Sequence, residues 1–166
     1  MSFANGRCAC GAVQYTLRAA PLIVHACHCR DCQRNTGAAF AVNLWIEGDR
    51  LELSGALFVQ RLPSGEGKGQ DLHRCAQCGV AIFTRYLATP GDMVFVRAGT
   101  LEDPGVIEPD VHIFTRSKVP WLQLPDGARA FETFYDLKST WPAASLERFH
   151  ANRQAHPPAQ DERSGS

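Results

Sequence analysis

The sequence predicts a mainly β fold with short helices, and three observations indicate it. The apolar runs are short, and several alternate with polar residues in the period of two that marks a half-buried strand. Glycine and proline, 14 and 10 residues, recur between these runs as turn signals. Seven cysteines lie in three close clusters, which indicates crosslinks beyond the hydrophobic core. A length of 166 residues with 45% hydrophobic composition suits one domain.

The first half of the chain carries most of the predicted strands. Residues 13–17 alternate between apolar and polar or small side chains, as in a strand with one buried face. The polar segment 30–36 stops at Gly37, as a short helix with a glycine C-cap would. A flexible, glycine-rich loop is expected over 63–70. The other strands expected in this half are 22–26, 40–46, 51–53 and 57–62.

The second half is predicted to add strands and one convincing helix. Residues 80–86 and 93–98 have strand character, and 112–115 and 130–135 are weaker strand candidates. A helix is expected over 143–151, because apolar residues recur there at helical spacing after a proline. From Asn152 onward the composition is too polar to pack, so we expect a frayed, disordered tail.

The charge balance argues against a nucleic-acid partner. Lysine plus arginine equals aspartate plus glutamate at 17 each, so the formal net charge is zero. Affinity for nucleic acid depends largely on clustered lysine and arginine side chains that neutralise phosphates. The chain has no such cluster, and we expect no nucleic-acid binding.

Cysteine usage and hydropathy indicate a reduced compartment. Seven cysteines cannot all pair as disulfides within one chain, and residues 1–7 lack an apolar stretch of signal-peptide length. No segment approaches the roughly 18 uninterrupted apolar residues of a membrane span. We therefore expect a cytoplasmic protein without membrane association; the sequence does not indicate its oligomeric state.

The spacing of the cysteines predicts two metal sites. Cys8 and Cys10 form one pair and Cys75 and Cys78 another, and both pairs end in Cys-Gly, where glycine lets the backbone wrap beneath a metal. A structural zinc commonly takes two ligands from each of two such turns, so these four cysteines are expected to share one ion. Spacing alone does not fix the partition, and a site made of Cys75 with the middle cluster is the alternative.

The middle cluster, Cys27, Cys29 and Cys32, has no fourth cysteine left to close its site. Three protein ligands leave one coordination position for water or substrate, which is typical of a catalytic zinc. The alternative is a closed structural site in which a histidine supplies the fourth ligand. The candidates for that ligand are His25, His28 and His73.

Four motifs together resemble the glutathione-dependent formaldehyde-activating enzyme (Gfa) family, also called the centromere protein V family. They are Gly6-Arg-Cys8-Ala-Cys10-Gly-Ala-Val-Gln-Tyr15, Cys27-His-Cys29-Arg-Asp-Cys32-Gln-Arg-Asn-Thr-Gly37, Cys75-Ala-Gln-Cys78-Gly79 and His112-Ile-Phe-Thr-Arg-Ser-Lys-Val-Pro-Trp121. The resemblance implies a Mss4-like, zinc-stabilised β fold, with a Gfa-like zinc-binding domain over 1–138 and a C-terminal helix and tail over 139–166. It also implies two Zn²⁺ per chain, a structural ion on the four paired cysteines and a catalytic ion on the other three.

Sulfur-rich zinc suits the binding and deprotonation of another thiol, because three thiolates make the ion a weak Lewis acid towards water. Together with the resemblance, this favours a carbon–sulfur lyase or synthase that acts on an adduct of glutathione, or another thiol, with a small aldehyde such as formaldehyde. Its catalytic residues are Cys27, Cys29 and Cys32. The alternative is a non-catalytic zinc-binding structural or interaction module of the same fold.

Glutathione carries two carboxylates, so cations near the metal are candidate substrate ligands. These are Arg30, Arg34, Arg116 and Lys118. Trp121 and Phe114 are candidate apolar walls, and His112 is a candidate proton carrier. Each also has a plain interpretation, as solvated surface for the arginines or as core for the aromatic residues.

Overall fold

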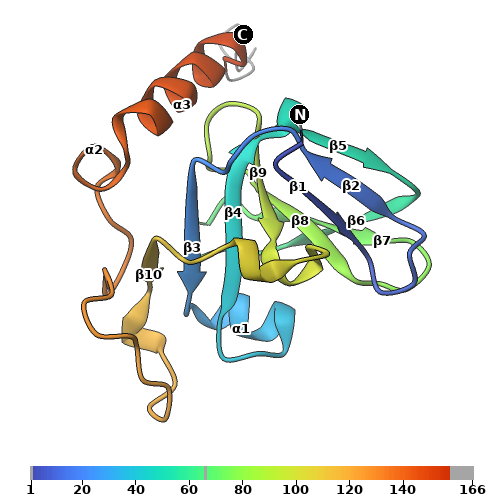
Figure 1. Cartoon of the computed structure of the whole chain (residues 1–166). Helices are drawn as coiled ribbons and strands as arrows, with labels where there is room; N and C mark the ends of the chain where they lie inside the picture. The colour runs from blue at the N-terminus through green and yellow to red at the C-terminus, as the bar shows by residue number, and fades with distance from the viewer. Residues whose placement is uncertain (1, 66, 158–166) are drawn as a thin grey trace, which may run out of the picture.

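The computed structural model describes residues 2–65 and 67–157 (Figure 1). Within these ranges, ten strands form two sheets and the helices are short. This arrangement confirms the predicted mainly β fold. No helix in the described part of the chain is long and apolar enough to cross a membrane.

The smaller sheet is antiparallel and contains three strands. Their order is β1 (Ala4–Arg7), β2 (Gln14–Leu17) and β5 (Leu51–Ser54). Tyr15 and Leu17 of β2 are buried, whereas Gln14 is exposed and Thr16 is half-buried, as their alternation predicts. The strand expected over 13–17 is therefore confirmed, whereas β1 was not predicted.

The larger sheet contains seven strands. In spatial order they are β10 (Val111–Ile113), β3 (Ile23–Cys27), β4 (Ala41–Glu47), β9 (Met93–Arg97), β8 (Ala81–Tyr86), β7 (Gln70–Cys75) and β6 (Leu57–Leu62). All neighbours are antiparallel except β10 and β3, which are parallel. The central strands β3 and β9 are buried on both faces, which explains why they lack the alternation of β2.

The helices follow the predicted start and stop signals. Helix α1 (Arg30–Thr36) ends at Gly37, whose left-handed backbone (φ 66°) bonds back to Gln33, as the glycine C-cap predicts. Helices α2 (Leu137–Thr140) and α3 (Ala143–Ala155) lie near the C-terminus. Short 3₁₀ turns are found at Gly48–Arg50, Ala98–Thr100, Pro104–Val106 and Thr115–Ser117.

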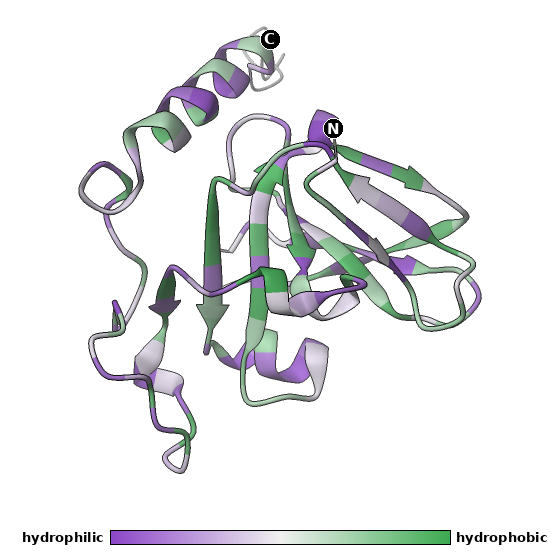
Figure 2. Cartoon of the chain, in the orientation of Figure 1, coloured by the Kyte–Doolittle hydropathy of each residue, from purple (hydrophilic) through white to green (hydrophobic). Residues whose placement is uncertain are grey.

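Two hydrophobic clusters lie on opposite faces of the larger sheet. The first fills the space between the two sheets and includes Leu17, Leu44 and Val96. The second lies on the other face and includes Trp45 and Phe149, so that α3 packs on the sheet. Figure 2 shows the central strands largely in hydrophobic colours, while α3 mixes hydrophobic and hydrophilic residues.

Two expectations for the C-terminal region were wrong. Residues 130–135 form only one bridge, between Ala130 and His112, instead of a strand. The neighbouring β10 ends at Ile113, and the next residue, Phe114, has a left-handed backbone (φ 56°) that interrupts regular strand pairing.

The predicted start of the tail at Asn152 was also wrong. Helix α3 continues to Ala155, and the Asn152 side chain is buried and accepts a hydrogen bond from the backbone N–H of Asp92 at 2.8 Å. A polar residue can therefore be packed when it satisfies a backbone donor. The rest of the predicted tail, 158–166, lies outside the described residues.

Candidate metal centre

The three-cysteine group is built where β3 meets α1. Cys27 ends β3, Cys29 is the N-cap of α1, and Cys32 lies in the first turn of that helix. The Cys29 sulfur accepts a hydrogen bond from the backbone N–H of Cys32 at 3.3 Å. The backbone N–H of His28, between the first two cysteines, donates to the carbonyl of Ile113 at 2.9 Å. These contacts bring the three Sγ atoms within 4.8 Å of one another.

One member of this group is less buried than the other two. Cys27 and Cys32 are buried, whereas Cys29 is only half-buried. Among residues 2–65 and 67–157, no histidine, aspartate or glutamate joins the three sulfur atoms. The group therefore offers three protein ligands to a metal ion.

The histidines considered as a fourth ligand have other partners. His25 Nε2 lies 2.6 Å from the Tyr135 hydroxyl, and burial lowers the pKa of His25 to about 3, so this ring is neutral. His28 Nε2 lies 3.0 Å from His112 Nδ1. The ring of His73 stacks on Phe83 with centroids 4.1 Å apart. None of the three belongs to the sulfur group.

The three thiols of this group differ in pKa. Hydrogen bonds with Cys27 and Cys29, supported by the positive charge of Arg97, hold the pKa of Cys32 well below its usual value. A hydrogen bond with Cys29 raises the pKa of Cys27. Although its hydrogen bond with Cys27 has the opposite effect, Cys32 and burial raise the pKa of Cys29 to about 11. One thiolate is thus stabilised within the group.

Four polar side chains that were not identified from the sequence lie beside Cys32. Asn43 Nδ2 and the Tyr86 hydroxyl are each 4.0 Å from Cys32 Sγ. Arg97 donates from Nη1 to Asn43 Oδ1 and from Nη2 to Thr84 Oγ1, the latter at 3.3 Å. The sequence contained one signal for them, namely polar residues within otherwise apolar strands.

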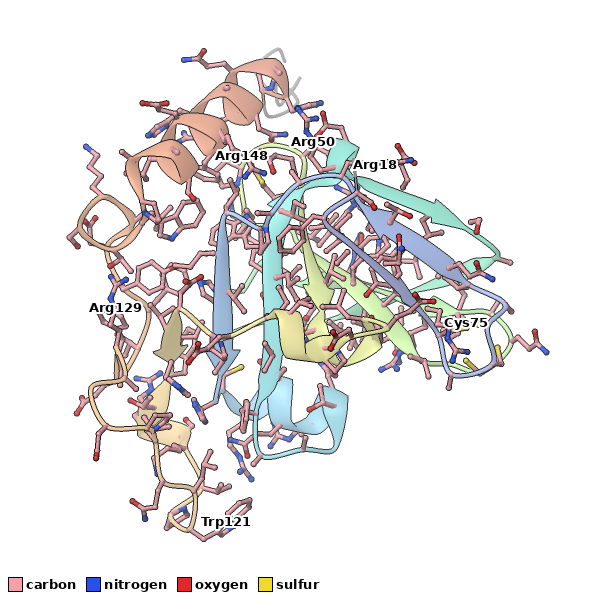
Figure 3. The ribbon with its side chains drawn as sticks, in the orientation of Figure 1. Arg18, Arg50, Cys75, Trp121, Arg129 and Arg148 are labelled. Carbon is pink, nitrogen blue, oxygen red and sulfur yellow. The ribbon has the colours of Figure 1, made fainter. Side chains whose placement is uncertain are left out.

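The four-cysteine group joins two turns that are distant in the sequence. Cys8 and Cys10 lie in the turn between β1 and β2, whereas Cys75 ends β7 and Cys78 lies in the turn between β7 and β8. All four Sγ atoms lie within 4.8 Å of one another. Figure 3 shows Cys75 near other sulfur atoms at one end of the molecule. Cys75 therefore lies with the N-terminal pair, as predicted, and not with the middle cluster.

Backbone amides surround the sulfurs of this group. The N–H of Val13 donates to Cys8 Sγ at 3.2 Å, and those of Gln77 and Cys78 donate to Cys75 Sγ at 3.4 and 3.5 Å. Gly79 closes its turn with a positive φ of 74°, a conformation that favours glycine. Such amides orient thiolate ligands and stabilise their charge.

The sulfur separations fit a tetrahedral metal site. Metal–sulfur bonds of about 2.3 Å at tetrahedral angles place sulfurs about 3.8 Å apart. Cys10 Sγ lies 3.4 Å from Cys8 Sγ and 3.8 Å from Cys75 Sγ, and none of the seven cysteines is in a disulfide. Both cysteine groups can therefore hold a metal ion.

The candidate cations on α1 are exposed. Arg30 donates to Gln33 Oε1 at 2.6 Å, and Arg34 lies 3.7 Å from Asp31 with 73% of its side chain exposed. Both arginines thus lie on the helix that carries Cys32, with their charged ends available to solvent.

The remaining substrate candidates belong to β10 and to the chain that follows it. Lys118 Nζ donates to the backbone carbonyls of Val119 and Leu122, at 3.3 and 2.5 Å, so its ammonium group holds its own loop. Trp121 is 72% exposed at the tip of this loop (Figure 3). His112, half-buried, contacts His28 of the three-cysteine segment.

Comparison with known proteins places the chain in a family. The family model described as glutathione-dependent formaldehyde-activating enzyme matches residues 3–117, well over half of the chain. The chain belongs to this family. Membership supports a role related to glutathione and formaldehyde, and the matched segment contains all seven cysteines.

Two further comparisons add little to the functional assignment. No curated protein is significantly similar to the chain in sequence. A crystal structure of a Rhodobacter sphaeroides protein is similar to this Gfa-family chain with a TM-score of 0.45 and 22% identity, over 63% of this chain and 91% of that one. This similarity is too low to indicate a function.

Proposed function

We propose that this protein is a zinc-dependent carbon–sulfur lyase or synthase that acts on the adduct of glutathione, or a similar thiol, with a small aldehyde such as formaldehyde. The observation that carries the proposal is the group of three cysteines with one half-buried member and no fourth protein ligand in the described chain. Family membership supplies the class of substrate.

The proposed reaction is the addition of a thiol to an aldehyde. The thiol sulfur forms a bond to the carbonyl carbon, the carbon–oxygen π bond breaks, and the thiol proton ends on the new hydroxyl oxygen. Elimination is the same process in reverse. Because thiols and aldehydes also combine unaided in water, the protein needs to supply mainly proximity, orientation and a thiolate.

Cys27, Cys29 and Cys32 are the residues that would hold the ion. A zinc ion held by these three thiolates would supply a coordination position suited to a substrate thiol and would favour its deprotonation. The rigid strand end and helix turn keep the three sulfurs on one side, and the half-buried Cys29 marks the side from which substrate enters.

His112 is the proposed proton carrier. Its Nδ1 is engaged by His28 Nε2 at 3.0 Å, which fixes the ring beside the three-cysteine segment. Burial lowers the pKa of His112, so the neutral ring that accepts a proton is favoured at physiological pH. Arg30, Arg34 and Trp121 are proposed to contact the remainder of the thiol, with Lys118 shaping the loop that carries Trp121.

Exchange NMR tests the proposal directly. Zinc-loaded protein in catalytic amount is expected to accelerate the exchange between free glutathione and its formaldehyde adduct, whereas Cys32→Ser is expected to lose this acceleration. Thr36→Ala is a matched control, because it removes only a hydrogen bond to the carbonyl of Cys32 on the same helix and no metal ligand. Equal exchange rates with wild type, Cys32→Ser and buffer would instead support a non-catalytic zinc module.

A further inference from the structure

Arg97 is a buried cation on the sheet face that carries the three-cysteine group. It ends β9 and lies directly opposite Asn43 of β4 in the antiparallel register. Only 6% of Arg97 is exposed. A guanidinium group keeps its charge at any physiological pH, so the protein holds a full positive charge inside its core.

The hydrogen bonds of Arg97 leave this charge without a carboxylate partner. Its side chain donates to Asn43 and Thr84, both neutral, and its Nε has no hydrogen-bond partner. None of the ion pairs within the described chain includes Arg97. A buried ion costs several kcal/mol of desolvation unless an opposite charge compensates it.

The sulfur group lies one side chain away from Arg97. Asn43 receives a hydrogen bond from Arg97 and points its own Nδ2 at Cys32 Sγ, 4.0 Å away. Asn43 is therefore a neutral bridge between the guanidinium and the sulfur.

We propose that Arg97 is the buried counter-ion of the three-cysteine centre. Three thiolates around a divalent ion leave one net negative charge, and the guanidinium neutralises it. The centre can then accept one more anion, the thiolate of the substrate, without accumulating a larger negative charge. This deepens the proposed function and rests on it for the presence of a metal at the three cysteines. Arg97 is thus a positioning residue and not a catalytic one.

Two variants deprive the sulfur group of its counter-ion in different ways. Arg97→Met replaces the guanidinium by an apolar chain, and Asn43→Asp keeps Arg97 but gives it a carboxylate that competes with the sulfurs for its charge. Arg97→Lys is the matched control, because it retains a positive charge. The four-cysteine site on the opposite side of the sheet is the internal reference in each protein.

Zinc affinity, measured by competition with a chromophoric chelator at neutral pH, is the first readout. Arg97→Met and Asn43→Asp are both expected to bind zinc at the three cysteines about 10- to 100-fold more weakly, with the four-cysteine site unchanged. Arg97→Lys is expected to recover most of the affinity. The proposal is overturned if both variants retain the wild-type affinity, or if both metal sites weaken equally.

Cobalt substitution provides a measurement that should not change if Arg97 has only a packing role. The visible absorption of cobalt at the three cysteines reports binding of 2-mercaptoethanol as an anion and of imidazole as a neutral ligand. Arg97→Met is expected to weaken the anion selectively, and equal weakening of both ligands contradicts the proposal. If the wild-type protein binds only one zinc, the proposed function fails as well; if it binds two with unchanged affinities in all variants, the counter-ion role alone fails.

Discussion

The two faces of the larger sheet each hold one cysteine group, in different surroundings. Cys8 and Cys75 belong to the cluster between the sheets, whose other members are mainly aliphatic. Cys27 and Cys32 belong to the opposite cluster, which is rich in aromatic residues. That second face also carries buried polar side chains that bond to one another or to the site, including His25, Asn43 and Arg97.

The difference between the two faces indicates which of them carries residues with a functional role. Burial of polar and charged groups is costly, so their concentration on one face indicates a role other than stability. The four-cysteine group instead joins turns 65 residues apart at Cys10 and Cys75, and backbone amides satisfy its sulfurs. We therefore expect that group to stabilise the fold and the other to serve the chemistry.

The largest effect is expected from Cys75→Ser. Cys75 is fully buried, and its loss should prevent a metal ion from joining the N-terminal turn to the β7–β8 turn. We expect the free energy of unfolding to fall by about 3–5 kcal/mol, because structural metal binding contributes directly to folding. Urea unfolding of the zinc-loaded protein measures this loss, and a decrease below about 1 kcal/mol would contradict the structural role.

Cys29→Ser should have a small effect on stability and a large effect on activity. Serine is a favourable N-cap, so α1 keeps its first turn, and the half-buried side chain leaves little void. We expect the free energy of unfolding to change by at most about 1–2 kcal/mol, while the acceleration of glutathione–formaldehyde exchange falls about 100-fold or more. Wild-type exchange rates with one zinc per chain would remove the three-cysteine centre from the chemistry.

A smaller effect is expected from hydroxyl removal in the two cores. Tyr135 lies 2.6 Å from His25 Nε2 and accepts a hydrogen bond from Trp141 Nε1 at 2.7 Å. Tyr135→Phe leaves both buried partners unsatisfied and should destabilise the protein by about 1–3 kcal/mol. Tyr15→Phe, in the other cluster, is the matched control because its hydroxyl contacts only the part-buried Thr100. A larger loss for Tyr15→Phe would reverse the comparison of the two faces.

The sequence predicted the elements whose local signals agree with the tertiary structure. Gly37 ends α1 as a glycine C-cap should, and the cysteines form the two expected groups. The short strands β1 and β7 were missed because their residues are polar or mixed and their pairing is set by partners elsewhere in the chain. Asn152 was missed for the same reason, since its role depends on the backbone of Asp92.

The sequence predicted residues of the candidate site only where their spacing along the chain indicates their chemistry. Cysteine spacing indicates metal ligands, whereas the relation of Arg97 to Cys32 depends on strand register between β4 and β9 and on helix α1. Lys118 shows that a charged side chain does not by itself identify a substrate ligand. Its charge made it a candidate substrate ligand, but its amine is occupied by two backbone carbonyls of its own loop.

Trp121→Ala should produce the smallest change and decides whether the exposed loop belongs to the functional face. Because 72% of Trp121 is exposed, the free energy of unfolding should change by no more than about 0.5 kcal/mol. If its ring covers the bound thiol as proposed, the glutathione concentration at half-maximal rate should rise about threefold to tenfold, with the maximal rate retained. Val106→Ala is a control at another exposed apolar position. Unchanged glutathione dependence in Trp121→Ala would confine substrate contacts to α1 and His112, nearer to the three sulfurs.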